Sequence, residues 1–542
     1  MKASKKLTFP KLDNEFIENI LRQLVNQYSV IQIFFSKNHS SVFSHLIIHI
    51  EKNSDAQELQ QSRWVKKVRN RYQIDVYFIY SVKFHHKFSL GHPFVEFYCQ
   101  PSAVIYQNEE LRDSPIITRE WKKYKKKFNA FQERFYHDHD LHKSQVQNLI
   151  SEGCSNSVFT SYARLIKYDL EYLEELYAGT TFNALNLDER INDMIEYIPE
   201  IQKYFVKSGN SRYYLTDLFA KAKEATADDD AIYQNEMYEA VGIAEENLYQ
   251  LIEKRLDELK RMIKKQSFLV EKVPNQIDGK PKDSVLETAI ETILNFVEAE
   301  QVYLYQQITF GEKTTYYLML ISEGAGNEKL SLISQSLKSS MNGKFDFVLI
   351  SHSRSWIQKN LFHTQSFFTS IIKKKCLIYS SSPYHPEFHW EVPHNPCHAD
   401  LYFHYKSSKN SAFQFFEIAN NPKGNYQGLE YLFSLFFLSF CRTYIFVKTY
   451  YLPNYLSSQS LWQLCLYADS DIQKYEYLTE QFWTDFFPYL DKNMAIHHRL
   501  SKLDKEKVVQ MNVIVEKLMD ELHNLVIESK LLSNFHKDDS DE

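Results

Sequence analysis

The 542-residue chain is poor in glycine and lacks the short motifs of several large enzyme classes. It contains only 12 Gly. Few glycines mean few tight turns, which favours long helices. The sequence has no Gly-x-Ser-x-Gly motif, no P-loop and no Gly-x-Gly-x-x-Gly fingerprint. These absences argue against the hydrolase, P-loop and dinucleotide-binding classes that depend on those motifs.

The chain also lacks paired cysteines, a strong charge of one sign and a long apolar run. Its six Cys include no Cys-x-x-Cys, which fits free thiols in a reducing compartment. A net charge of −6 argues against nucleic-acid binding over the whole surface but leaves room for local basic stretches. No apolar segment follows the basic residues 1–6, and the longest apolar run, 431–441, is too short to span a bilayer. We therefore expect a soluble cytoplasmic protein with no membrane contact.

What the sequence does contain is a faint internal repeat. Residues 30–260 match residues 300–523 in order, at an offset of about 270. The matched positions include Ile33 with Tyr303, Asp75 with Asp346, Tyr177 with Tyr450, Asp217 with Asp485 and Glu253 with Glu516. A period this long exceeds that of a solenoid repeat. It indicates a duplicated pair of domains.

Each half begins with strand patterns and continues with helical periodicity. In the first half we predict strands at 30–35, 43–50, 74–80 and 103–107, with helices at 13–28, 55–70 and 89–100. This order describes a small mixed sheet with helices on one face. Helices should follow at 118–136, 144–152, 157–178, 187–207, 212–226 and 233–265.

The second half repeats this plan after a linker with two Pro and one Gly. We predict strands at 301–306, 316–322, 344–350 and 376–380, and helices at 284–298, 355–372, 400–418, 425–450, 459–468, 473–490 and 503–533. The predicted fold class is α+β, with two sheet domains alternating with two helical bundles. The domains are 1–115 (sheet), 116–270 (helical), 271–283 (linker), 284–385 (sheet), 386–535 (helical) and 536–542 (acidic tail).

Each half resembles a minimal nucleotidyltransferase domain followed by a HEPN-type helical domain, a pairing common in bacteria. The resemblance is carried by the order of helix and strands at the start of each half and by the strand–loop–strand segments at 31–50 and 302–322. It is also carried by Asp75 and Asp346 in the third strands, and by the helices 165–177 and 437–450, which end at a break. The resemblance implies that the two helical domains pair within the chain, through 165–177 and 431–450. A homodimer is the alternative.

The resemblance further implies where a nucleotidyltransferase would hold Mg²⁺, and both copies have lost those residues. The family has Gly-Ser followed by Asp-x-Asp, and a third carboxylate on a neighbouring strand completes the metal site. The corresponding positions read Phe35-Ser36, His45 and Ile47 in the first half, and Gln306-Gln307, Tyr317 and Met319 in the second. Only the third carboxylate remains, as Asp75 and Asp346. One carboxylate does not hold two divalent ions, so we expect no transferase activity and no cofactor. The remaining cleft residues are Ser36, His45, Asp75, Tyr317 and Asp346, although a structural role for the two aspartates is the simpler reading.

An Arg-x4–6-His motif, as in active HEPN ribonucleases, has one match in the chain. Arg134 and His139 have this spacing, but they precede the usual motif helix and have no counterpart in the second half. In the family the Arg holds phosphate and the His supports acid–base chemistry. The alternative is a helix end rich in histidine, which we favour.

Two further groups of residues have alternative interpretations. The segment 384–404 contains His385, His389, His394, Cys397 and His398, which could bind Zn²⁺, although their spacing matches no standard zinc motif. The alternative, which we favour, is a proline-stiffened loop that packs His and Trp side chains against the domain junction. The stretches 63–71 and 122–127 interleave basic and aromatic residues, as a surface for nucleic-acid phosphates would. Solvated helix faces are the alternative for both stretches.

The sequence thus predicts a non-catalytic binding or regulatory protein derived from a nucleotidyltransferase–HEPN pair. Its partner would be a protein, a nucleotide or RNA. The alternatives are a metal-independent HEPN ribonuclease using Arg134 and His139, and a purely structural scaffold.

Overall fold

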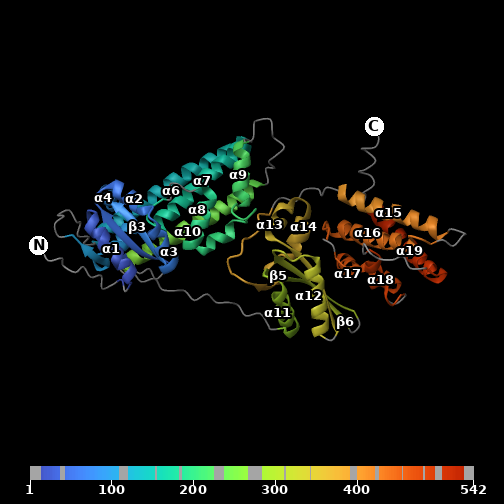
Figure 1. Ribbon diagram of the computed structural model, residues 1–542. Helices are drawn as coiled ribbons and strands as arrows, with labels where there is room; N and C mark the ends of the chain where they lie inside the picture. The colour runs from blue at the N-terminus through green and yellow to red at the C-terminus, as the bar shows by residue number, and fades with distance from the viewer. Residues whose placement is uncertain are drawn as a thin grey trace. The chain divides into compact units, whose positions relative to one another are not determined.

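The structure is a computed structural model (Figure 1). It describes residues 12, 14–36, 43–108, 120–152, 155–181, 186–224, 237–265, 283–310, 313–341, 343–390, 399–420, 426–453, 456–479, 483–494 and 503–529.

Tertiary contacts divide the chain into two compact units. Unit 1 comprises Met1–Asp278 with Tyr384–His389, and unit 2 comprises Gly279–Pro383 with Trp390–Glu542. The division near residue 278 falls within the predicted linker. The short segment 384–389 belongs to unit 1 because the Glu387 N–H donates to the Lys203 carbonyl (2.9 Å) and His389 stacks on Tyr214.

Unit 1 begins with a four-stranded mixed sheet. Its strands lie in the order β3-β2-β1-β4, where β1 is Val30–Ser36, β2 Ser44–Ile50, β3 Ile74–Tyr80 and β4 Val104–Gln107. Strand β1 runs antiparallel to β2 and β4, whereas β2 and β3 are parallel. All four strands were predicted from the sequence within two residues of these bounds.

Helices cover both faces of this sheet, so the prediction of helices on one face is wrong. One face packs on α1 (Glu15–Gln27), α2 (Asn53–Gln60) and α3 (Arg63–Tyr72). The other packs on α4 (Ser81–Ser89) and α5 (Pro93–Tyr98). The reason lies in the strands, which are apolar on both sides. Ile33 and Phe35 face the first layer while Phe34 between them faces the second.

The rest of unit 1 is a helical bundle built around α7 (Figure 1). Its elements are α6 (Trp121–Glu152), α7 (Ser155–Tyr177), α8 (Leu187–Tyr197), the 3₁₀ helix η2 (Pro199–Tyr204), α9 (Tyr214–Glu224) and α10 (Met237–Lys265). Helix α7 contacts α6, α8, α9 and α10. Its apolar residues, among them Leu165, Ile166, Leu170, Leu173 and Leu176, are buried. We predicted α6 as two helices, but it is continuous because His139 and Val146 in its polar stretch are buried in the bundle.

Gly179 ends α7 where a larger residue does not fit. Its φ is +78°, and an added Cβ would lie 2.3 Å from the nearest atom of the Phe94 ring on α5. The N–H groups of Ala178 and Gly179 both donate to the Glu174 carbonyl, which caps the helix.

Replacing Gly179 with alanine is expected to destabilise the junction of α7 and α5 by about 2–4 kcal/mol, from a left-handed backbone and an overlap with Phe94. Amide hydrogen exchange of α7 peptides in the full chain measures this loss. Gly209→Ala is the matched control, because no atom lies within 4 Å of its added Cβ. Equal effects of the two substitutions would contradict the packing argument.

Unit 2 contains a second sheet with the same strand order and directions. Its strands lie in the order β7-β6-β5-β8, with β5 antiparallel to β6 and β8, and β6 parallel to β7. The sheet domain consists of α11 (Ser284–Phe296), β5 (Ala299–Phe310), β6 (Lys313–Ser322), α12 (Asn327–Ser340), β7 (Phe345–His352), α13 (Arg354–Lys359), α14 (Leu361–Ile371) and β8 (Leu377–Ser380). Its helical part consists of α15 (Ala399–Ala419), α16 (Leu429–Thr449), α17 (Ser458–Ala468), the 3₁₀ helix η5 (Ser470–Leu478), α18 (Phe486–Asn493) and α19 (Lys505–Glu528). The α+β class with two small mixed sheets is therefore confirmed.

Helix α16 is the central helix of the second bundle. In the part of the chain that the structure describes, it alone is long and apolar enough to cross a membrane, but it is mostly buried, as a core helix is. It packs against α15, α17, α18 and α19 of its own unit. The apolar faces of α7 and α16 are each buried within their own unit, and their pairing with one another stays a prediction.

Candidate functional site

The predicted cleft of unit 1 lies where β1, β2 and β3 run side by side. Ser36 on β1 is the register partner of His45 on β2, and His45 is the partner of Asp75 on β3. The sequence therefore placed these three residues on adjacent strands correctly. The side chain of His45 is 1% exposed and that of Asp75 is 14% exposed.

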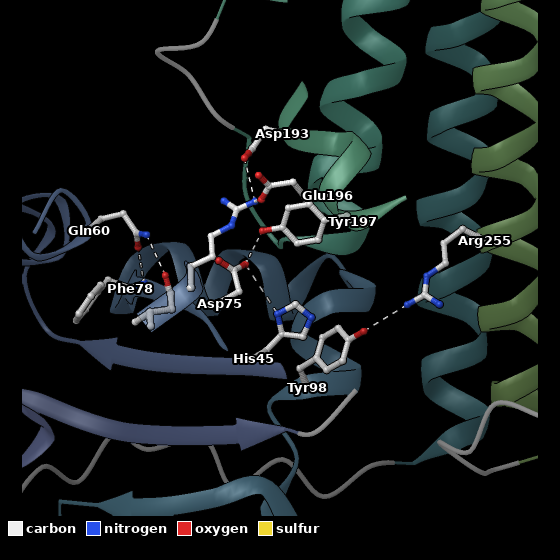
Figure 2. Close-up of polar contacts among 11 residues, drawn as sticks. His45, Gln60, Asp75, Phe78, Tyr98, Asp193, Glu196, Tyr197 and Arg255 are labelled. Atoms are coloured by element: carbon white, nitrogen blue, oxygen red, sulfur yellow. Dashed lines mark hydrogen bonds and ion pairs between the residues drawn. The ribbon is translucent and has the colours of Figure 1, made fainter. Parts of the chain in front are cut away.

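The Asp75 carboxylate is occupied by a tyrosine from the helical bundle (Figure 2). The hydroxyl of Tyr197 on α8 donates to Asp75 Oδ2 at 2.7 Å, whereas His45 Nδ1 lies 4.0 Å from the same oxygen. Burial raises the pKa of Asp75, and the nearby Arg69 opposes this rise. The carboxylate is thus a hydrogen-bond acceptor within the fold.

Arg69 closes the solvent side of this group through contacts with α8. Its guanidinium lies 2.9 Å from a carboxylate oxygen of Asp193 and 2.9 Å from one of Glu196. It also lies over the rings of Phe43 and Tyr197. Arg69, which belongs to the predicted basic surface 63–71, is therefore engaged in contacts within unit 1.

The inner side of the cleft is closed by Tyr98 and Arg255. Tyr98 on α5 lies against the His45 ring at 4.5 Å, and Arg255 on α10 donates to the Tyr98 hydroxyl at 3.3 Å (Figure 2). Burial, followed by the charge of Arg255, lowers the pKa of His45 to about 3. His45 is therefore neutral at pH 7. The arrangement offers one engaged carboxylate and a neutral imidazole, which is not the ligand set that Mg²⁺ and a triphosphate require.

In unit 2 the predicted pair Tyr317 and Asp346 is not brought together. Tyr317 is the register partner of Val348, and Asp346 is the partner of Thr315, two residues away. The Tyr317 hydroxyl donates to the Gln463 carbonyl (3.1 Å), and Asp346 lies 3.6 Å from Lys338. The strand register pairs Thr315 with Asp346 as it pairs His45 with Asp75, so the counterpart of His45 in unit 2 is Thr315 and not Tyr317.

Arg134 and His139 do not form a nuclease pair. Five residues along a helix separate their directions by about 140°. Arg134 is exposed on α6, whereas His139 is 1% exposed and faces the bundle core. Its Nε2 lies 2.9 Å from Glu245 Oε1 and 3.7 Å from Asp169 Oδ1. The sequence gave no sign of these carboxylates, which come from α10 and α7.

The predicted zinc candidates are only partly described. His389 is buried against Tyr214, and burial lowers its pKa to about 4. His385 lies in the same segment of unit 1. His394, Cys397 and His398 lie outside the described residues, so a zinc site there stays a prediction.

A basic groove lies between the first turns of α6 and the last turns of α10. Its volume is about 700 Å³. It is lined by Lys125, Phe128, Asn129, Asp257, Lys260, Arg261, Ile263 and Lys264. The buried side chains of Phe128 and Ile263 form an apolar floor, and the charged residues are exposed. Four cations and one anion give the groove a strong positive bias in a chain of net charge −6.

The cations of this groove are available to a ligand. Lys125, Lys260 and Lys264 form no ion pair with any residue in the described ranges, and Arg261 reaches only the Asp257 carbonyl at 3.4 Å. Lys125 belongs to the basic stretch 122–127 predicted from the sequence. The contribution of α10 was missed, although basic residues in its last turns were visible as a signal.

A second groove, in unit 2, lacks this bias. It is lined by Phe310, Ser470, Asp471, Gln473 and Lys474, so one cation faces one anion.

Comparison with known proteins adds no further evidence, since no family model, no curated protein and no solved structure matches the chain.

Proposed function

We propose that this protein is a non-catalytic binding protein that holds the phosphates of single-stranded RNA in the groove between α6 and α10. The observation that carries this proposal is the set of exposed cations, Lys125, Lys260, Arg261 and Lys264, gathered from two helices over an apolar floor. A positively charged groove that follows a nucleic-acid backbone is how sequence-tolerant single-strand binding is achieved.

The spacing of the cations supports a strand as the ligand. Lys260 and Lys264 are one helical turn apart, about 6 Å along the axis of α10. Lys125 approaches from α6 on the other side of the groove. Charges that repeat along a groove suit a ligand with repeating phosphates better than a single small anion.

The closed cleft supports a role without catalysis. Asp75 is held by Tyr197, and Arg69 is held by Asp193 and Glu196. Arg134 and His139 point about 140° apart on α6, which disfavours the ribonuclease alternative. The scaffold alternative does not account for unpaired cations concentrated in one groove.

We also propose that the two units arose by duplication of a degenerate nucleotidyltransferase–HEPN pair. The supporting observation is that both sheets share one strand order and one set of strand directions. Both copies lack the residues that would bind the metal, which is consistent with selection for ligand binding without catalysis.

The triple variant Lys125→Gln/Lys260→Gln/Lys264→Gln is expected to bind single-stranded RNA about a hundredfold more weakly at 0.1 M salt. Each lost phosphate contact lowers the slope of log K against log salt by about 0.7, so the slope should fall by about 2. Fluorescence anisotropy of a labelled mixed-sequence RNA, titrated with the full chain at several salt concentrations, measures both quantities.

The matched control is Lys207→Gln/Lys221→Gln/Lys223→Gln, which makes the same change in net charge at exposed lysines that do not line the groove. It should retain the wild-type affinity and slope. Equal losses of RNA affinity in both triple variants would mean that binding depends on the overall charge of the protein and not on the groove. Mg²⁺-dependent nucleotide transfer or RNA cleavage by the wild-type chain would refute the non-catalytic role.

A further inference from the structure

The core of the first helical bundle contains one imidazole and two carboxylates that converge. His139 lies on α6, Asp169 on α7 and Glu245 on α10, and their side chains are 1%, 0% and 3% exposed. One ligand atom from each residue lies within 4.8 Å of the others. In the described part of the chain, no other group of His, Cys, Asp and Glu meets this criterion.

The distances between these atoms fit a shared cation. His139 Nε2 lies 2.9 Å from Glu245 Oε1 and 3.7 Å from Asp169 Oδ1. Nitrogen and oxygen ligands about 2.1 Å from one ion lie about 3.0–3.4 Å apart in octahedral or tetrahedral geometry. Small rotations of the side chains would bring all three atoms to that spacing.

Asp169 provides an independent sign of a missing partner. Neither of its carboxylate oxygens has a hydrogen-bond partner among the residues the structure describes. An ionised carboxylate with no hydrogen bond is strongly disfavoured in a protein interior unless a cation compensates it. Asp169 Oδ1 faces His139 Nε2, so the unsatisfied group is directed into the cluster.

Within the described ranges, Lys143 is the side-chain cation whose charge acts on Asp169, but its ion pairs are with two glutamates. Lys143 Nζ lies 2.8 Å from Glu246 and 3.5 Å from Glu245, at the solvent side of the bundle. No ion pair joins Lys143 to Asp169 among the described contacts. Asp169 is therefore stabilised either by a bound cation or by a proton of its own, since burial raises its pKa well above the usual range.

Aromatic side chains surround the ligands and shield them from water. Tyr249 lies 4.5 Å and Phe135 lies 5.6 Å from the His139 ring. Such packing restricts the side-chain rotamers, which favours a fixed coordination geometry. His139 Nδ1 makes no hydrogen bond with the described residues, so no contact there prevents Nε2 from acting as the unprotonated ligand.

We propose that His139, Asp169 and Glu245 bind one first-row divalent cation, of the Zn²⁺ type, that joins α6, α7 and α10. One imidazole nitrogen with two carboxylate oxygens suits Zn²⁺ and its neighbours better than Mg²⁺ or Ca²⁺, which prefer oxygen ligands alone. The site is separate from the basic groove and does not depend on the RNA-binding proposal.

The test uses the full chain, freed of any histidine tag and treated with a chelator. Isothermal titration with ZnCl₂ should show binding that Asp169→Asn and Glu245→Gln abolish. The unfolding temperature of the wild type should rise by roughly 5–10 °C at a hundredfold excess over Kd. Co²⁺ should give a visible d–d spectrum that the same variants lose, and Mg²⁺ should have no effect.

Asp169→Asn has a second expected effect that a structural role alone does not predict. It should raise the unfolding temperature of the metal-free protein, because it removes a buried carboxyl group that is unfavourable without a cation, while abolishing the rise caused by Zn²⁺. Glu246→Gln is the matched control on the same helix turn and should retain Zn²⁺ binding. Glu245→Gln serves as the deciding variant if Asp169→Asn fails to fold.

The variant His394→Ala/Cys397→Ser/His398→Ala separates this site from the other zinc candidates of the chain. It should leave Asp169-dependent binding intact. The proposal is overturned if the wild type binds no Zn²⁺, or if Zn²⁺ binding survives Asp169→Asn and Glu245→Gln. The first outcome would mean that Asp169 is neutralised by a proton instead of a metal ion.

Discussion

Replacing Arg190 with methionine is expected to destabilise unit 1 by about 3–5 kcal/mol, because it leaves a buried carboxylate without its partner. Arg190 on α8 is 2% exposed and Glu174 on α7 is 0% exposed. One guanidinium nitrogen of Arg190 donates to both Glu174 oxygens, at 2.8 and 2.7 Å, and a second lies 3.2 Å from Glu171. This ion pair joins the helix that carries Tyr197 to the centre of the bundle, so its loss also loosens the closed cleft.

The double variant Arg190→Met/Glu174→Leu separates charge from packing. If the uncompensated charge of Glu174 causes the loss, the double variant recovers most of the stability. Urea unfolding of the full chain, with hydrogen exchange of α7 and α8 peptides to assign the transition, measures both variants. Lys254→Met removes an exposed ion pair with Glu200 and should cost less than about 1 kcal/mol. A double variant as unstable as the single one would show that the loss of stability comes from the packing of the methionine side chain and not from the charge of Glu174.

Acidification from pH 7 to pH 5 is expected to destabilise unit 1 by several kcal/mol. Burial lowers the pKa of His45 and His49 to about 3 and that of His92 and His389 to about 4. A histidine in the unfolded chain titrates near pH 6.5, so below that pH the unfolded state binds protons that the folded state excludes. The stability is thus fully present above pH 7 and is lost as the pH falls toward 4. Each histidine contributes roughly 2 kcal/mol to the loss by pH 5, or roughly 8 kcal/mol for four.

Three buried aspartates oppose part of this loss. Burial raises the pKa of Asp75, Asp169 and Asp193. The folded state binds their protons more readily than the unfolded state does, so their contribution to stability rises as the pH falls. A variant isolates the histidine contribution from this background.

His49→Phe is the suitable variant, because His49 already stacks on Phe84 at 4.4 Å. It should reduce the loss of stability between pH 7 and pH 5 by roughly 2 kcal/mol. The titratable neighbour of His49 is His85, and its hydrogen-bond partner is Ser81. Urea unfolding at the two pH values gives the difference, and the exposed His86→Gln serves as the control. An unchanged pH dependence in His49→Phe would mean that His49 is protonated in the folded state.

Much of the sheet architecture could be predicted from local pattern. Strands such as Val30–Ser36 and Ile74–Tyr80 are β-branched and aromatic runs bounded by turns. Helix boundaries were less predictable where one residue breaks a long periodic segment. Pro199 ends α8, and Asn360 separates α13 from α14, although each region was predicted as one helix.

Helices α4 and α12 were missed, although α12 buries Leu330, Ile333 and Leu337 at helical spacing. The two candidate binding sites could not be predicted, because each gathers residues from helices far apart in the chain. Lys125 and Lys264 meet only through the packing of α6 on α10. His139 stood in a polar run that was predicted partly as a helix break, and only the fold shows that it faces Asp169 and Glu245.

The central claim is that the groove between α6 and α10 holds RNA without altering it. Photo-crosslinking of a 4-thiouridine-labelled single-stranded RNA to the full chain tests this claim most directly, with mass spectrometry of the peptides and gel analysis of the RNA. The account predicts crosslinks within residues 122–129 and 257–264 and an RNA of unchanged length. Crosslinks confined to other segments, or an RNA that is shortened or extended, would contradict it.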